Sequence, residues 1–279
     1  MLENIRYTNH LGETIKFDKS EHILIAHNDL RDYSWDYDTE SDRITEFKLT
    51  GKTEKSLPVR IFGETADKVR EARNNLFRVI NADITANKPG AIWYDDYYMT
   101  GFIFESSKSR YMPNYGNITL KFVTDNPYWI KERLLSFRPG QSISLENYGN
   151  YKKYAYKYNY QYVDGSENQT VTNEALSPAP FILKIYGAAT NPDIAIGSDH
   201  HKINTTLSAG QTLILTAIDN NKTIIRINAD GTKTNLFNSR EKSIDVFKKI
   251  PTGTFNVSWE GEYTFDIIVF DRRSEPPWT

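Results

Sequence analysis

The second half of the chain is a succession of short apolar runs, each bounded by turn residues. Phe181–Tyr186 follows two prolines, Leu213 and Leu215 follow Gly210, and apolar and polar residues alternate from Tyr263 to Val269. The runs recur roughly every ten residues, and no long segment with helical periodicity interrupts them. This pattern predicts a β-sandwich or jelly roll.

The first half predicts more strands and one helix. Thr65 can cap a helix, Asp67 lies in its first turn, and apolar residues then recur at spacings of three and four, so we expect a helix over Thr65–Asn81. Alternating runs predict strands at Ile5–Tyr7, Thr14–Phe17, His22–Ala26, Pro58–Phe62, Ala91–Tyr94, Tyr97–Phe104, Lys108–Tyr111 and Ile118–Val123.

The stretch Thr119–Glu132 indicates where the first domain closes. Its strand pattern runs into Asp125-Asn126-Pro127, and the ladder should stop there because proline lacks an N–H and restricts the residue before it. We expect the aromatic pair that follows, Tyr128 and Trp129, to pack under the strand's edge. Glu132–Pro139 is then predicted to link two domains, residues 1–135 and 136–279.

An aromatic row in the first half predicts a hairpin. Tyr33, Trp35 and Tyr37 alternate with aspartates, and a second apolar run with Phe47 answers them. The hairpin either packs in the core or projects from the domain. Because large apolar patches are rare on monomers, a projecting hairpin would point to a protein contact.

Two further surface patterns each leave two interpretations open. Arg70, Arg73 and Arg78 give the predicted helix a basic surface, which either faces a partner or is simply solvated. Five tyrosines alternate with other residues, and in a strand all five would line one face. That face either packs on a sheet or subunit, or forms a stacking platform for sugars or single-stranded nucleic acid. The tyrosines are Tyr154, Tyr156, Tyr158, Tyr160 and Tyr162.

The residue types of catalytic and metal sites are sparse. Cysteine is absent, which excludes thiol chemistry and cysteine-based zinc sites. Asp95 and Asp96 should point apart in a strand or turn, and Asp199-His200-His201 supplies at most part of a zinc site. Motifs of hydrolases, nucleotide-binding loops and metalloproteases are missing. We therefore predict no enzyme, no cofactor and no metal.

Charge and hydropathy also limit the partners. The net charge of −2 gives no strong attraction to nucleic acid or to an anionic membrane. No apolar run approaches the ~20 residues that span a bilayer, and the first residues lack a secretion signal. We expect neither nucleic acid nor membrane as a partner, and synthesis in the cytoplasm.

Several of these stretches resemble the distal tail protein family of siphophage-type bacteriophages and prophages of Gram-positive hosts. In the first domain the resemblance is carried by the closure at Asp125–Trp129, and at the other end of the chain by Arg272–Trp278. In the second half it is carried by Ile185-Tyr186-Gly187, Asn191-Pro192, Gly210–Leu213, Asp230-Gly231, Asn235-Leu236-Phe237 and Pro251-Thr252-Gly253.

The resemblance implies both a fold and a role. The implied fold is mainly β, with an α+β N-terminal domain that forms a ring and a C-terminal galectin-like or jelly-roll β-sandwich. The implied role is a virion structural protein of the tail tip, a hexameric ring that joins the tail tube protein to the tail-associated hub or lysin protein and holds receptor-binding proteins.

In the resembled family, the region around Tyr33–Leu49 is an arm that packs on the neighbouring subunit. The candidate contact residues are therefore Tyr33, Trp35, Tyr37, Phe47, Arg70 and Arg73. The alternative is a carbohydrate-binding β-sandwich protein that attaches to the host cell surface through the tyrosine row. A β-sandwich glycoside hydrolase would need a pair of buried carboxylates in a cleft, which the sequence does not reveal.

Overall fold

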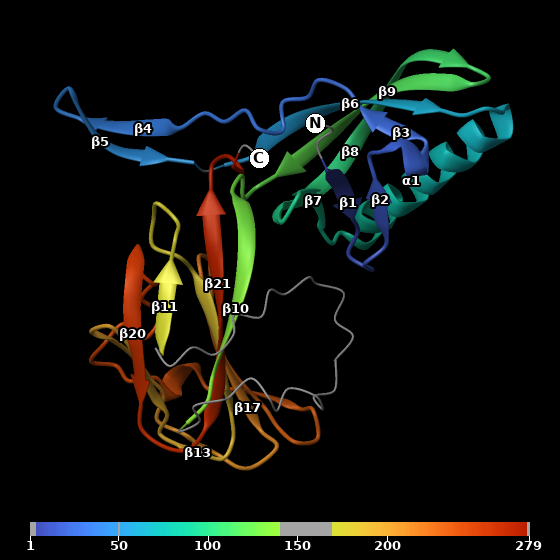
Figure 1. Ribbon diagram of the computed structural model, residues 1–279. Coiled ribbons are helices and arrows are strands. Elements are labelled where there is room, and N and C mark those ends of the chain that lie inside the picture. The colour runs from blue at the N-terminus through green and yellow to red at the C-terminus, as the bar shows by residue number, and fades with distance from the viewer. Residues whose placement is uncertain (1–3, 50, 140–168, 278–279) are drawn as a thin grey trace. The chain divides into compact units, whose positions relative to one another are not determined.

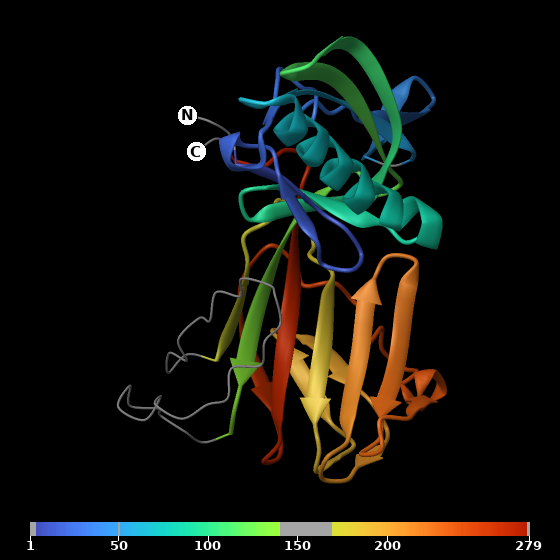
Figure 2. The ribbon, with the colours of Figure 1, turned by 90° about the vertical axis from the view of Figure 1, so that its right-hand side faces the viewer.

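The computed structural model describes residues 4–49, 51–139 and 169–277 (Figures 1 and 2). Its contacts divide the chain into two units: unit 1 is Met1–Lys131 with Arg273–Thr279, and unit 2 is Glu132–Arg272. The described part is rich in antiparallel strands and contains one α-helix, so the mainly β prediction is confirmed. The predictions for Tyr154–Tyr162 lie outside the described residues.

Unit 1 contains two larger antiparallel sheets that share one long strand, and a separate two-stranded sheet of β4 and β5. Its strands are β1 (Ile5–Thr8), β2 (Thr14–Lys16), β3 (Ile23–Ile25), β4 (Asp36–Glu40), β5 (Arg43–Lys48), β6 (Thr53–Phe62), β7 (Gly90–Tyr94), β8 (Tyr97–Met112), β9 (Tyr115–Thr124) and the start of β10 (Trp129–Phe137). One sheet has the order β2-β1-β7-β8, and the other has the order β3-β6-β9-β8. A short 3-10 helix, η1 (Lys19–Glu21), precedes β3.

Strand β8 changes partner after its fifth residue, Gly101. Up to Gly101 it pairs with β7, and from Phe102 onward it pairs with β9. A Cβ at Gly101 would clash with the backbone carbonyl of Val123, so glycine is needed where the two sheets meet. The separate strand predicted at Lys108–Tyr111 is wrong: these residues continue β8, and two register shifts along β8 disturb the alternation that sequence reading depends on.

Helix α1 (Ala66–Ala86) packs its apolar stripe against the core of unit 1. Thr65 caps it as predicted, accepting a hydrogen bond from the backbone N–H of Lys68. The helix runs beyond the predicted Asn81 and ends at Asn87, which takes the left-handed conformation. The prediction stopped early because the next stripe position is occupied by Asp83, a charged residue that is fully buried.

The closure after β9 is confirmed in part. Strand β9 ends at Thr124, directly before the Asp-Asn-Pro stop, and Trp129 is fully buried with its ring edge-on to Tyr94. The segment Glu132–Pro139 was predicted to link two domains; most of it is part of strand β10, which continues to Phe137, and the division between the units falls after Lys131. Leu135 and Phe137 pack on the core of unit 2, and this burial keeps the segment extended.

Unit 2 is a sandwich of two antiparallel sheets. One has the order β19-β18-β17-β12-β21-β10 and the other β11-β20-β14-β15, and side chains from both form one core. Its elements are β11 (Thr170–Asn173), β12 (Phe181–Tyr186), β13 (Ala189–Thr190), β14 (Asp193–Ile196), β15 (Asp199–Lys202), β16 (Thr206–Leu207), β17 (Thr212–Ile218), β18 (Asn221–Ile227), β19 (Lys233–Asn235), η3 (Phe237–Ser239), β20 (Gly253–Trp259) and β21 (Thr264–Arg273).

The chain passes from one unit to the other within two strands, β10 and β21. The division falls inside β10, after Lys131, and inside β21, after Arg272. The segment that follows β21 therefore belongs to unit 1. Sequence reading assigned that segment to the second domain because nothing in its composition indicates a return to the first.

Candidate functional site

The hairpin of β4 and β5 exposes nearly all of its side chains. The two strands pair with each other, and among the described strands they pair with no third one. Every residue of β4 and most of β5 is exposed. The exposed fractions of the aromatic residues are 50% for Tyr33, 39% for Trp35, 59% for Tyr37 and 57% for Phe47. The hairpin is thus not part of the core, which removes the first of the two interpretations.

A bulge gathers the apolar side chains of the hairpin on one face. Tyr37 lies opposite Phe47, with ring centroids 6.2 Å apart, and Thr39 lies opposite Ile44. Ile44 and Phe47 are three residues apart, so in a regular strand they would point to opposite faces. The register shift between Asp38 and Thr39 corrects this and places Ile44 beside Phe47.

The opposite face of the hairpin is charged. Asp36 lies opposite Lys48 and Asp38 opposite Glu46, and the Lys48 ammonium forms ion pairs with Asp38 and Glu46. The turn between the strands has positive φ at Ser41 and Asp42, as the tightest hairpin turns require. The hairpin is therefore amphipathic although neither of its faces is buried.

The root of the hairpin, Asn28–Asp32, is firmly attached to unit 1. Leu30 is fully buried, the side chain of Asp29 accepts a hydrogen bond from the backbone N–H of Ser56 at 2.6 Å, and the Lys55 ammonium donates to the carbonyl of Asp32. Burial lowers the pKa of Lys55, partly offset by the nearby Asp29 and Asp32 carboxylates. The root of the hairpin is thus fixed, whereas its strands β4 and β5 are uncovered.

The two arginines predicted as contact residues lie on α1. The Arg70 guanidinium pairs with Asp67, three residues earlier, at 2.7 Å, and Arg73 is half-buried. Of the six predicted contact residues, the structure brings Tyr37 and Phe47 into direct contact. The strongest candidate surface is therefore the apolar face of the hairpin, namely Tyr37, Ile44 and Phe47.

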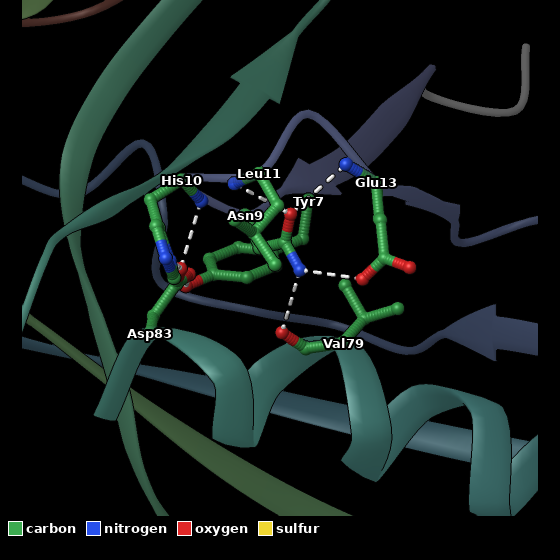
Figure 3. A network of polar contacts seen from close by, with 7 residues as sticks. All are labelled: Tyr7, Asn9, His10, Leu11, Glu13, Val79 and Asp83. Atoms are coloured by element: carbon green, nitrogen blue, oxygen red, sulfur yellow. Dashed lines mark hydrogen bonds and ion pairs between the residues drawn. The ribbon is translucent and has the colours of Figure 1, made fainter. Parts of the chain in front are cut away.

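A buried polar network joins α1 to the turn after β1, and sequence reading missed it (Figure 3). The Asp83 carboxylate accepts hydrogen bonds from the Tyr7 hydroxyl at 2.5 Å and from the backbone N–H of His10 at 2.8 Å, and the His10 ring nitrogen lies 2.6 Å away. Asn9 adds a hydrogen bond to the carbonyl of Val79. The available signal was a lone carboxylate in the apolar stripe of the helix.

The network is a structural element and has no room for a ligand. Asp83 and Tyr7 are fully buried, and a Cβ at Gly90 would clash with both of their oxygen atoms. Burial, followed by the hydrogen bond to Asp83, raises the pKa of Tyr7 far above its ordinary value, so the phenol stays a donor. The network fixes the end of α1 against the first sheet.

The other titratable candidates are structural as well. Asp95 and Asp96 form the turn between β7 and β8, and Asp96 pairs with Lys131. His201 is buried and bonds the carbonyl of Val246, whereas the adjacent His200 is exposed beside Asp193.

Neither a metal cluster nor a membrane-spanning helix is found in the described residues. Those residues contain no group of three histidine, aspartate or glutamate side chains that could hold a metal. The α-helix found in the described ranges is not apolar enough to cross a membrane.

Solved structures with the same fold come from phage adsorption machinery. A chain of the phage P2 baseplate in its activated conformation with Ca superposes with a TM-score of 0.62 at 13% identity, covering 99% of this chain and 100% of that one. The SPP1 Dit protein, described as a paradigm of the hub adsorption apparatus in phages that infect Gram-positive hosts, gives 0.61 at 12% identity, with 98% and 100% covered.

The same baseplate with Sr gives a TM-score of 0.62 at 14% identity, with 99% and 100% covered. No protein-family model matches the chain, and no curated protein matches it significantly. The fold that the sequence resemblance implied is therefore confirmed over nearly the whole chain: it is the fold of the SPP1 Dit protein and of a component of the P2 baseplate.

Proposed function

We propose that this protein is a structural subunit of a phage tail tip, a distal tail protein that forms a closed, hexameric ring. The ring joins the tail tube protein to the hub below it and carries receptor-binding proteins. The role is mechanical rather than enzymatic, and its location is the virion. The fold shared with the P2 baseplate component and with SPP1 Dit supports this proposal.

The observation that carries the proposal is the uncovered apolar face of the β4–β5 hairpin. An isolated two-stranded hairpin is marginally stable in water, and here neither face gains stability from burial. An apolar face held out on a firmly attached root is suited to covering a neighbouring copy. Closed rings form when each subunit offers one surface and its complement at a fixed rotation.

The test is the solution mass of the full chain by light scattering, with negative-stain images of the same peak. We expect a ring for the wild type and a shift towards monomer for Tyr37→Ser combined with Phe47→Ser. The matched control is Leu176→Ser, which replaces an apolar side chain of unit 2 that is 98% exposed. A ring that survives the double substitution would exclude the hairpin face as the contact.

The alternative function, carbohydrate binding at the host surface, is distinguished by a glycan-binding assay on the same sample. A protein that stays monomeric at high concentration and binds glycans would replace the ring proposal. Pull-downs with tube, hub and receptor-binding proteins then test the neighbours assigned to the ring.

A further inference from the structure

Arg31, in the root of the hairpin, binds the segment that follows β21. Its Nε donates to the Glu275 carboxylate at 3.1 Å, and its Nη2 donates to the carbonyl of Pro276 at 2.8 Å. Its Nη1 donates to the Tyr94 hydroxyl at 2.9 Å, and the guanidinium lies 4.8 Å from the centre of the Tyr94 ring. One side chain therefore connects three parts of unit 1: the root of the hairpin, strand β7, and the residues Arg273–Pro277, called the distal segment below.

These contacts are sheltered rather than fully solvated. The Arg31 side chain is 11% exposed and that of Glu275 is 28% exposed. Charge-assisted hydrogen bonds with several donors in fixed geometry are stronger than neutral ones, and shelter from water reduces their screening. The Arg31 junction is thus a firmer connection than the exposed ion pairs of the hairpin.

The Arg31 contacts hold the root of the hairpin in addition to the contacts from strand β6. Lys55 and Ser56 of β6 hold Asp29 and Asp32, and Glu275 and Pro276 hold Arg31 between them. Strand β4 begins a few residues later, at Asp36, and all of its residues are exposed. The segment that leads into β4 is therefore held within Asn28–Asp32, and the buried Leu49 anchors the chain directly after β5.

The partner of Arg31 comes very late in the chain. All of unit 2, Glu132–Arg272, lies between the rest of unit 1 and the distal segment. We propose that Arg273–Pro277 is a positioning clamp for the hairpin, so that a chain becomes competent for subunit contact only after this segment has been made and has docked. The assembly part of this inference rests on the proposed ring, whereas the positioning part does not.

The positioning part is tested by hydrogen–deuterium exchange on the full chain. In Arg31→Met, the amides of residues 28–35 should exchange about tenfold faster, because losing hydrogen bonds from a charged group shifts the opening equilibrium by that order. Glu275→Gln keeps an acceptor for Arg31 and removes its charge, so it should raise the exchange of the same amides by a smaller factor. Amides of α1 should be unchanged. Glu262→Gln, the same change at an exposed residue of unit 2, is the control. Unchanged exchange in the root would overturn the clamp.

Light scattering of the same variants tests the assembly part. Weaker self-association in Glu275→Gln, with normal association in Glu262→Gln, supports the clamp. Intact rings with a loosened root would overturn its role in assembly and leave the ring proposal standing. If wild-type chains form no ring, the ring proposal fails, and the exchange experiment still decides whether the segment positions the hairpin.

Discussion

Two of the hairpins in unit 1, β8–β9 and β4–β5, obtain their stability from different sources. In the β8–β9 hairpin, Ile118, Leu120 and Phe122 are buried in the core cluster that includes α1. In the β4–β5 hairpin the same antiparallel pairing occurs without burial, and its apolar side chains remain exposed. The same backbone pairing thus occurs with and without packed faces, and only the β8–β9 hairpin gains stability from burial within unit 1. In the β4–β5 hairpin the backbone hydrogen bonds are formed, but the side chains are not buried.

The largest expected effect separates the two hairpins directly. Phe122→Ala should destabilise unit 1 by about 3–5 kcal/mol, because Phe122 is fully buried and truncation leaves a cavity. Phe47→Ala should change monomer stability by less than ~0.5 kcal/mol, since the side chain is exposed. Urea denaturation of both variants makes the comparison. Similar losses in the two would show that the β4–β5 hairpin is packed in solution.

The polar network gives a smaller effect. Tyr7→Phe keeps the ring and removes the hydroxyl, which leaves the buried Asp83 carboxylate with one donor fewer. We expect a loss of about 1–3 kcal/mol in the free energy of unfolding, again by urea denaturation. Tyr33→Phe, a matched change at an exposed tyrosine, should have almost no effect. A neutral Tyr7→Phe would mean that Asp83 finds another donor.

The free energy of unfolding should depend on pH through a buried histidine in unit 2. Burial lowers the pKa of His201, partly offset by its bond to Val246 and by Asp199, Asp193 and Asp245. Below its ordinary pKa of about 6.5 the unfolded chain binds a proton that the folded chain resists, so stability should fall as the pH drops from there.

Unfolding free energies measured from pH 7.5 to pH 5 test this prediction. The fall should be reduced in His201→Leu and retained in His200→Ala, since His200 is exposed. A pH dependence that is identical in wild type and His201→Leu would assign it to other groups.

The smallest effect on stability tests the bulge. Exchanging Ile44 and Thr45 keeps the composition and moves the isoleucine off the face of Phe47. Monomer stability should change by less than ~0.5 kcal/mol, because both positions are exposed. Self-association measured by light scattering should weaken. Unaltered association would remove Ile44 from the contact surface.

The sequence predicted well those elements whose local pattern agrees with their surroundings. The cap of α1 at Thr65 and the stop at Pro127 depend on properties of single residues, and both were found where expected. The hairpin was predicted because aromatic residues alternate in it. Its exposure was left open, since an alternating strand looks the same whether or not something covers it.

What could not be predicted depends on partners that are distant in the chain. Asp83 is stabilised by Tyr7 and His10, more than seventy residues away, so its place in an apolar stripe looked like the end of a helix. The face that carries Ile44 depends on a bulge, which local spacing does not reveal. Arg31 and Glu275 are 244 positions apart, and their junction is visible only once the chain is folded.

The sharing of β8 between both sheets of unit 1 has a mechanical consequence. Because one covalent backbone runs through Gly101 from the β7 ladder into the β9 ladder, tension applied to either sheet is carried by peptide bonds rather than across a side-chain interface. The two sheets cannot slide past each other without breaking the hydrogen bonds of that strand. Relative sliding of the two sheets is therefore resisted by a continuous covalent strand, in which Gly101 marks the change of partner from β7 to β9.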